Sequence, residues 1–188
     1  MALEDWYNKG LTFEQYRDGM RLNRQEMQQI YDSVEFQEDD LTLFKHAAWQ
    51  DWKGIVLTAD WCGDAALSVP IIQRIAELCG MELRFLIRDD NLELMDQYLT
   101  NGTSRMIPIF IFLDAEGQEQ FVWGPRSPEM QKWLDALKEQ LPPIETSDYR
   151  EAQQNMYRTI KQRIASDPEA WRSVIRSIKP LFIKAINL

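Results

Sequence analysis

A short apolar segment that leads directly into a helical one constrains the fold of this chain more than any other feature. Residues 53–59 form a nearly unbroken apolar run, which is typical of a strand buried on both faces. A helix is predicted from Asp64 to Cys79, followed by Gly80 at the position where helices commonly end. Residues 82–87 then alternate as a second strand. This strand–helix–strand unit predicts two parallel strands joined by a right-handed crossover.

A β-hairpin and a further helix are predicted downstream of this unit. Residues 107–113 are strongly apolar and carry Pro108 near their start, where the missing N–H of proline is tolerated. Gly117 marks a turn into a fourth strand over residues 120–123, which gives an antiparallel hairpin. A helix over residues 128–141 follows. The sequence therefore predicts an α/β fold with a mixed central sheet of about four strands and helices on both faces.

Further helical patterns lie on both sides of this central region. The pattern Thr12-x-x-Gln15 is a capping box that begins a long helix, and Asp167-Pro168 begins the last one. Pro180 is expected to kink or shorten that last helix. The additional helices are expected over residues 13–34, 39–49, 91–99 and 149–165, and from Pro168 onward.

Length and composition favour one globular unit. The chain has 188 residues, of which 45% are hydrophobic, and this suits a single domain with appended helices rather than two full domains. We expect residues 1–50 to be an N-terminal helical extension packed on a core of residues 51–142. Pro142-Pro143 interrupts the chain, and residues 143–188 are expected to form a C-terminal helical extension. The apolar faces of these terminal helices must be buried within the chain or by self-association.

Charge and composition disfavour several classes of partner. The net charge of −9, from 30 acidic and 21 basic residues, repels phosphate backbones and anionic lipid, so nucleic acids and membrane surfaces are not expected as partners. No run of about 18 apolar residues is present, and residues 1–10 lack the apolar core of a secretory signal. Two cysteines are too few for a disulfide framework. A cytoplasmic location is therefore expected.

The sequence offers little chemistry outside one cysteine. His46 has no cysteine or acidic partner at metal-ligand spacing, and we interpret it as a surface or packing residue. No phosphate-binding loop or Ser-His-Asp arrangement is visible, so no metal and no cofactor are expected. Cys62 directly precedes the predicted central helix, whose free N–H groups and dipole stabilise a thiolate.

The segment Ala59-Asp60-Trp61-Cys62-Gly63 resembles the active-site segment of the thioredoxin family, which lies between a strand and a helix. Other positions agree with that family: Pro70 lies eight residues after the cysteine, Ile107-Pro108 opens the third strand, and Gly124 follows the fourth. The similarity covers about residues 52–141. The resemblance implies a thioredoxin-like fold over these residues, with Cys62 as the candidate catalytic residue. The helical patterns on either side add extra N- and C-terminal helices to that fold.

The resemblance also implies a substrate site beside the cysteine. In the family, the proline equivalent to Pro108 has a cis peptide bond, and its loop pairs with an extended substrate peptide. Trp61 would supply an apolar wall to this groove, although simple packing of Trp61 in the core is an equally open alternative. The residues that the resemblance assigns to substrate binding are Trp61, Gly63, Asp64, Met106, Ile107 and Pro108.

The chain departs from the family at three positions. Ala65 replaces the second cysteine, which in the family releases the mixed disulfide intramolecularly. Asp64 replaces the proline between the two cysteines, and its carboxylate should raise the pKa of Cys62. Val56 replaces a buried acid. Cys79 lies 17 positions after Cys62, about 25 Å along a helix, which exceeds the roughly 7 Å Cα separation that a disulfide allows.

Two functions stay open on these grounds. The first is monothiol thiol–disulfide exchange through Cys62 in cell redox homeostasis, with protein or low-molecular-weight thiols and disulfides as partners. The second is a non-redox module that binds a protein or peptide in the groove beside the Pro108 loop. The missing resolving cysteine implies at most a monothiol oxidoreductase and not an efficient disulfide reductase.

Overall fold

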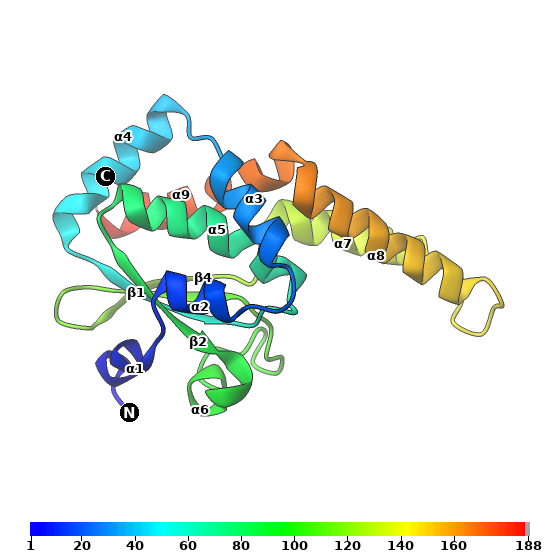
Figure 1. Cartoon of the computed structure of the whole chain (residues 1–188), viewed down its shortest axis with the longest axis horizontal. Coiled ribbons are helices and arrows are strands. Elements are labelled where there is room, and N and C mark those ends of the chain that lie inside the picture. The colour runs from blue at the N-terminus through cyan, green and yellow to red at the C-terminus, as the bar shows by residue number, and fades with distance from the viewer. Residues whose placement is uncertain (187–188) are drawn as a thin grey trace.

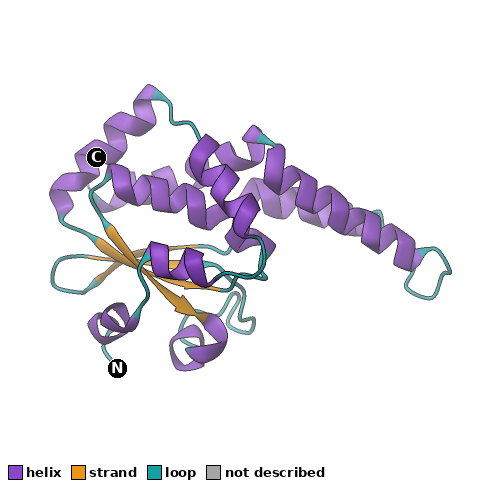
Figure 2. Ribbon diagram, viewed as in Figure 1, coloured by secondary structure: helices purple, strands orange, loops and turns teal. Residues whose placement is uncertain are grey.

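A four-stranded mixed sheet is the centre of the structure, a computed structural model that describes residues 1–186 (Figures 1 and 2). The strands lie in the order β2-β1-β3-β4. β1 (Lys53–Thr58) runs parallel to β2 (Glu82–Ile87) and antiparallel to β3 (Ile109–Leu113), and β3 runs antiparallel to β4 (Glu119–Trp123). The predicted mixed sheet, with one parallel pair and a hairpin after it, is confirmed.

The helices that pack around this sheet agree with most of the predicted ranges. α5 begins at Gly63, directly after Cys62, and ends at Leu78, and Gly80 follows with a positive φ of 65°. Short 3₁₀ helices, η1 and η2, span Ala48–Gln50 and Arg88–Asp90. The α-helices are α1 (Leu3–Lys9), α2 (Phe13–Gly19), α3 (Arg24–Ser33), α4 (Glu38–Ala47), α5 (Gly63–Leu78), α6 (Leu92–Met95), α7 (Pro128–Glu139), α8 (Tyr149–Ser166) and α9 (Pro168–Ala185).

The inner strands are buried because helices cover both faces of the sheet. In Figure 1, α3, α5 and α9 lie above the sheet, whereas α1 and α6 lie below it. Val56 in β1 lies opposite Phe85 in β2 and Phe110 in β3, and all three side chains are fully buried. This two-sided cover explains why β3 is entirely apolar in sequence and why the centre of β1, residues 55–57, is apolar.

The single helix predicted over residues 13–34 is wrong, because the chain leaves the helical conformation at Met20. Met20 has extended backbone angles, with φ −67° and ψ 136°. The carboxylate of Asp60 accepts hydrogen bonds from the backbone N–H groups of Arg21 (2.8 Å) and Leu22 (3.2 Å). These tertiary bonds from the β1–α5 loop take the place of helical ones, so α2 and α3 are separate helices.

The last helix, α9, continues through Pro180 to Ala185, so the predicted shortening of this helix is wrong. Pro180 lies on the exposed face, where water can reach the carbonyl that proline leaves without a helical partner. The buried face carries Phe182, whose ring centre lies 5.1–5.8 Å from those of Phe44, Trp52, Phe112 and Phe121. α9 is therefore part of the central hydrophobic core.

The N-terminal residues join the outer edge of the sheet. Leu11 follows α1, and its N–H and carbonyl pair with the carbonyl and N–H of Phe85 in β2, at 2.9 and 2.8 Å. Gly10 approaches β2 so closely that an added Cβ would lie 2.6 Å from the Cβ of Arg84. The sequence patterns predicted neither α1 nor this bridge.

The capping box predicted at the start of α2 is confirmed. The hydroxyl of Thr12 accepts a hydrogen bond from the N–H of Gln15 (3.2 Å), and Oε1 of Gln15 accepts one from the N–H of Thr12 (2.9 Å). We expect Thr12→Ala to lower the free energy of unfolding by about 1 kcal/mol, because the N–H of Gln15 loses its acceptor. Urea denaturation measures this loss. Thr103→Ala, in an exposed turn, is the control; an equal loss there would contradict the capping role.

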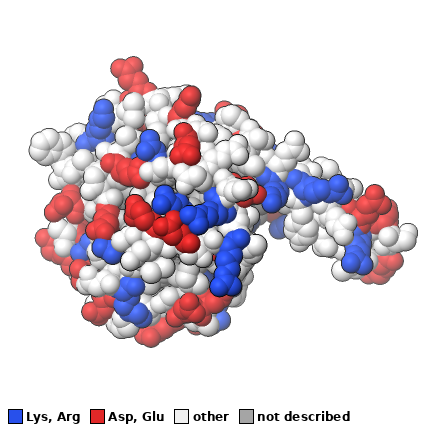
Figure 3. All heavy atoms as spheres, viewed as in Figure 1, with Lys and Arg blue, Asp and Glu red and all other residues white. Residues whose placement is uncertain are grey.

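The surface carries charges of both signs. Figure 3 shows acidic and basic side chains interspersed over the visible face, so the net negative charge does not gather there in one patch. Within residues 1–186, no helix is long and apolar enough to cross a membrane. The same part of the chain contains no group of three His, Cys, Asp or Glu side chains that could hold a metal ion, and His46 is exposed.

Candidate functional site

Cys62 lies at the junction between β1 and α5, where it is the N-terminal capping residue of a 16-residue helix. Its backbone is extended (φ −84°, ψ 120°), so the chain turns from strand to helix at this residue. The side chain is 7% exposed. The free N–H groups of the first turn of α5 therefore face a nearly buried sulfur atom.

The loop before β3 lies directly against this sulfur. Sγ of Cys62 donates a hydrogen bond to the carbonyl oxygen of Ile107 at 3.3 Å. The Ile107–Pro108 peptide bond is cis, both residues are buried, and Met106 is half-buried. Gly124, after β4, packs so tightly on this loop that an added Cβ would lie 2.2 Å from the carbonyl oxygen of Pro108. The fold thus places the loop before β3 against Cys62, and Gly124 packs on the same loop.

Trp61 lies outside the core, since its side chain is 48% exposed. The guanidinium of Arg88 lies 4.7 Å from the centre of the Trp61 ring and donates a hydrogen bond to the carbonyl of Arg105 at 3.2 Å. Arg88 thereby links Trp61 to the residues just before the Pro108 loop. Core packing, one of the two sequence-based interpretations of Trp61, is therefore wrong.

A cavity of about 500 Å³ opens beside Trp61. Its walls come from α2 and the loop that follows it, from the β1–α5 loop and from the end of β2. The apolar side chains that line it are Leu11, Tyr16, Met20, Trp61 and Ile87. Residues upstream of the sheet therefore build part of the surface next to Trp61.

A partly buried ion pair lies next to the cysteine, between Asp64 in the first turn of α5 and Arg126 in the β4–α7 loop. Oδ2 of Asp64 accepts hydrogen bonds from Nε (3.1 Å) and Nη2 (2.5 Å) of Arg126. The Asp64 and Arg126 side chains are only 15% and 12% exposed. Sequence reasoning identified Asp64 and missed Arg126. The available signal was its position two residues after Gly124, a glycine that the resemblance had already matched to the family.

The surroundings of Cys62 favour the neutral thiol. Burial raises the pKa of Cys62 above its usual value, and the carboxylate of Asp64 raises it further. The N–H groups of Ala65 and Asp64 and the guanidinium of Arg126 lower the pKa but do not cancel this rise. The thiol is therefore the main form at neutral pH, and it donates to the Ile107 carbonyl.

Helix α8 covers one side of this site. An added Cβ on Gly63 would lie 3.4 Å from Cδ1 of Ile164, whose side chain is 5% exposed. Ile164 lies near the C-terminal end of α8, whereas the rest of this helix extends away from the body beside α7 (Figure 1). No sequence pattern pointed to Ile164, because its contact with Gly63 joins residues that lie far apart in the chain.

The second cysteine lies at the far end of the same helix. Cys79 is the C-terminal capping residue of α5, it is buried and free, and burial raises its pKa to about 12. Ala65, in the first turn of α5, is 2% exposed. Cys79 is separated from Cys62 by the full length of α5, so the two thiols cannot form a disulfide within this fold.

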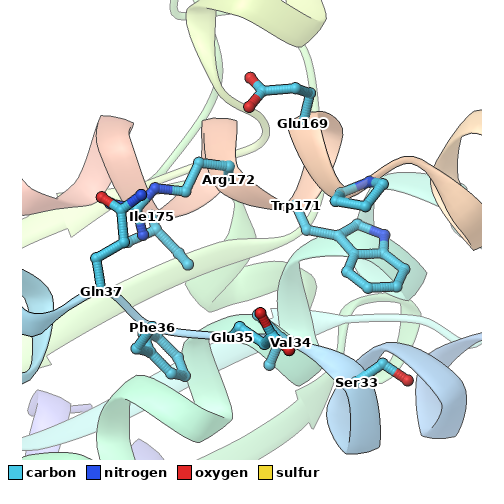
Figure 4. A pocket seen from close by; sticks show the side chains of 10 residues that line it. Ser33, Val34, Glu35, Phe36, Gln37, Glu169, Trp171, Arg172 and Ile175 are labelled. Atoms are coloured by element: carbon cyan, nitrogen blue, oxygen red, sulfur yellow. The ribbon is translucent and has the colours of Figure 1, made fainter.

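A separate cavity of about 390 Å³ lies away from Cys62, between the α3–α4 linker and the start of α9 (Figure 4). Phe36 and Trp171 contribute aromatic side chains to its wall. Arg172 also lines it, but its guanidinium is bound to the buried carboxylate of Asp40 and to Gln37. None of the predicted site residues lines this cavity.

Comparison with known families decides the classification. A sequence model of the thioredoxin family matches residues 10–138. This chain belongs to the thioredoxin family. The match extends from the segment before α2 to the end of α7 and contains Cys62, Ile107-Pro108 and Gly124. No curated protein matches the chain.

Two solved structures share the fold along almost the whole chain. One is a protein of unknown function from Pseudomonas aeruginosa, with a TM-score of 0.68 and 13% identity, covering 98% of this chain and 99% of that chain. The other is an HIV epitope scaffold, with a TM-score of 0.65, 13% identity and the same coverage. At this identity the likeness concerns the fold alone. It shows that the thioredoxin-like sheet together with its flanking helices occurs in other proteins.

Proposed function

We propose that this thioredoxin-family chain carries out monothiol thiol–disulfide exchange through Cys62. The observation that carries the proposal is the position of Sγ at the N-terminus of α5, 3.3 Å from the carbonyl of Ile107 and beside Pro108. An extended peptide paired with residues 106–108 would bring a disulfide next to this sulfur. The partners would be protein or low-molecular-weight thiols and disulfides in a reducing compartment such as the cytoplasm.

The exchange takes two balanced steps. The thiolate of Cys62 attacks a disulfide R–S–S–R′; the Cys62–S–R bond forms, the S–S bond breaks, and R′–S⁻ leaves and takes up a proton. The thiolate of an external low-molecular-weight thiol, R″–S⁻, then attacks the sulfur of R. Cys62 leaves as a thiolate and R–S–S–R″ forms. An external thiol is needed because Ala65 has no sulfur with which to release the partner.

The first step should be slow at neutral pH and accelerate as the pH rises. Burial and Asp64 raise the pKa of Cys62, so only a small part of the protein carries the reactive thiolate at pH 7. Below that pKa, the thiolate fraction increases about tenfold per pH unit. The proposal therefore describes a weak exchange protein rather than a fast reductase.

Intact-mass measurement tests the proposal. After incubation with an excess of oxidised glutathione, we expect one adduct per chain, more rapidly at pH 9 than at pH 7. The adduct should be absent in Cys62→Ser, persist in Cys79→Ser, and disappear on addition of a reduced small thiol. No adduct under these conditions, or an adduct that depends on Cys79, would show that Cys62 does not exchange.

A second function is favoured by the contrast between Cys62 and its neighbour. The thiol is 7% exposed and hydrogen-bonded, whereas Trp61 is 48% exposed beside an apolar cavity. A module that binds a peptide without chemistry would need only the Trp61 surface and the Pro108 loop. If this is the role, Cys62→Ala leaves partner binding and cellular phenotype unchanged, and Trp61→Ala weakens binding. Loss of partner binding or of the cellular phenotype in Cys62→Ala would exclude this non-redox function.

A further inference from the structure

The Asp64–Arg126 pair joins the start of α5, next to Cys62, to the loop after β4, which packs on the Pro108 loop. Asp64 lies two residues after Cys62 in α5. Arg126 lies two residues after Gly124, which contacts the carbonyl of Pro108. The guanidinium of Arg126 is held within the chain through all three of its nitrogens, because Nε and Nη2 donate to Asp64 and Nη1 donates to Gln131 at 2.7 Å. The geometry of the pair is thus fixed from both sides.

The two charges act on the Cys62 thiolate with opposite signs. A carboxylate repels the thiolate, whereas a guanidinium attracts it, and both effects are strengthened by burial of the two side chains to 15% and 12% exposure. In the intact pair the two effects oppose each other, and that of Asp64 is the larger. Removal of either charge alone would leave the other uncompensated in a poorly hydrated position.

Other polar groups around Cys62 are neutral or held elsewhere. Tyr16, from α2, is close enough to Cys62 for a thiolate there to raise the pKa of Tyr16. Burial raises that pKa to about 12, so Tyr16 is neutral, and its hydroxyl is hydrogen-bonded to Thr58. The carboxylate of Asp60 accepts from backbone N–H groups of the α2–α3 loop. α8 presents the apolar side chain of Ile164. The charges that can tune the thiol are therefore those of the ion pair.

We propose that Asp64 and Arg126 are positioning residues of opposite sign that together set the reactivity of Cys62. The biological purpose of this effect rests on the proposed function. The effect itself does not, because the reactivity of the Cys62 thiol can be measured without a partner. Asp64 holds the thiol in its neutral, hydrogen-bonded form, and Arg126 limits that effect. Loss of the Asp64 charge leaves a buried guanidinium facing the start of α5, which activates the thiolate. Loss of the Arg126 charge does the opposite.

The rate of alkylation by iodoacetamide between pH 6 and pH 11 tests this, in a Cys79→Ser background so that only Cys62 reacts. We expect Asp64→Asn to shift the midpoint of the pH profile of alkylation down by about one pH unit, which raises the alkylation rate about tenfold at pH 7. Arg126→Gln should shift it up by about one unit. The double variant Asp64→Asn/Arg126→Gln should return close to the parent protein, because both charges are gone.

The double variant separates an electrostatic effect from loosened packing. Loosened packing around Cys62 would expose the thiol in all three variants and move every pH profile of alkylation in the same direction, which would overturn the inference. An unchanged midpoint of the pH profile in both single variants would overturn it as well. Arg176→Gln, which breaks an ion pair between α9 and Glu129 of α7, is the control and should not move the midpoint. Opposite shifts without any mixed disulfide would uphold the inference and refute the exchange function.

Discussion

Replacement of Gly124 by alanine is expected to lower the free energy of unfolding by about 3 kcal/mol. Gly124 has φ 134°, a conformation that side chains with a Cβ rarely adopt. The added Cβ would lie 2.2 Å from the carbonyl oxygen of Pro108 and 3.2 Å from Cα of Ile109. These contacts are with backbone at the start of β3, so relief requires the strand or the loop to move rather than a side chain to rotate.

Urea denaturation of Gly124→Ala and of Gly19→Ala measures this effect with a matched control. Gly19 ends α2, has no positive φ, and an added Cβ would meet nothing within 4 Å. Gly19→Ala should therefore be neutral or slightly stabilising. Because the Pro108 loop must shift in Gly124→Ala, the pH profile of Cys62 alkylation should change as well. A stability equal to that of Gly19→Ala would mean that the Gly124 contact is not tight in solution.

Conversion of Ala65 to cysteine should produce the largest change in activity, an increase of at least about 100-fold in the reduction of protein disulfides. The new thiol would lie three positions after Cys62 on the first turn of α5, the spacing at which a second thiol releases a mixed disulfide. Release then becomes intramolecular, and the effective concentration of the resolving thiol greatly exceeds that of any external thiol. The measurement is insulin reduction in the presence of dithiothreitol.

Ala66→Cys is the matched control for this gain. Ala66 is the next residue of α5 and is as buried as Ala65, at 3% against 2% exposed, but its side chain leaves the helix in a different direction. Its added thiol should therefore not accelerate insulin reduction. If Ala65→Cys is no faster than Ala66→Cys, Cys62 is not positioned to react with protein disulfides, and the binding function gains support.

Periodicity and burial explain why most of the fold could be predicted from the sequence. The range predicted for β2, residues 82–87, is the one observed, because Leu83 and Phe85 are buried between more exposed neighbours and leave a pattern of period two, although Leu86 rather than Ile87 is buried at the end of the strand. β1 and β3 carry continuous apolar runs because both of their faces are covered. The error over residues 13–34 has a different origin: the bonds to Asp60 that separate α2 from α3 come from a segment almost 40 residues away.

In the candidate site, too, the sequence predicted the residues of a local pattern and missed those brought in by contacts between distant segments. The family pattern predicted Cys62 and Pro108 as neighbours, and the fold brings them together. Arg126, Arg88 and Ile164 lay outside that pattern, since each reaches the site through a contact that depends on the path of the whole chain. Charge or burial at one position of the sequence does not indicate which distant side chain will meet it.

The bridge between Leu11 and Phe85 has a consequence for how the sheet meets other chains. β2 is an outer strand, and its unpaired N–H and carbonyl groups would otherwise invite a further strand. Leu11 occupies both groups of Phe85, and Gly10 lies too close to Arg84 for another backbone to enter. The N-terminal residues thus protect this edge against strand addition by an aggregating copy.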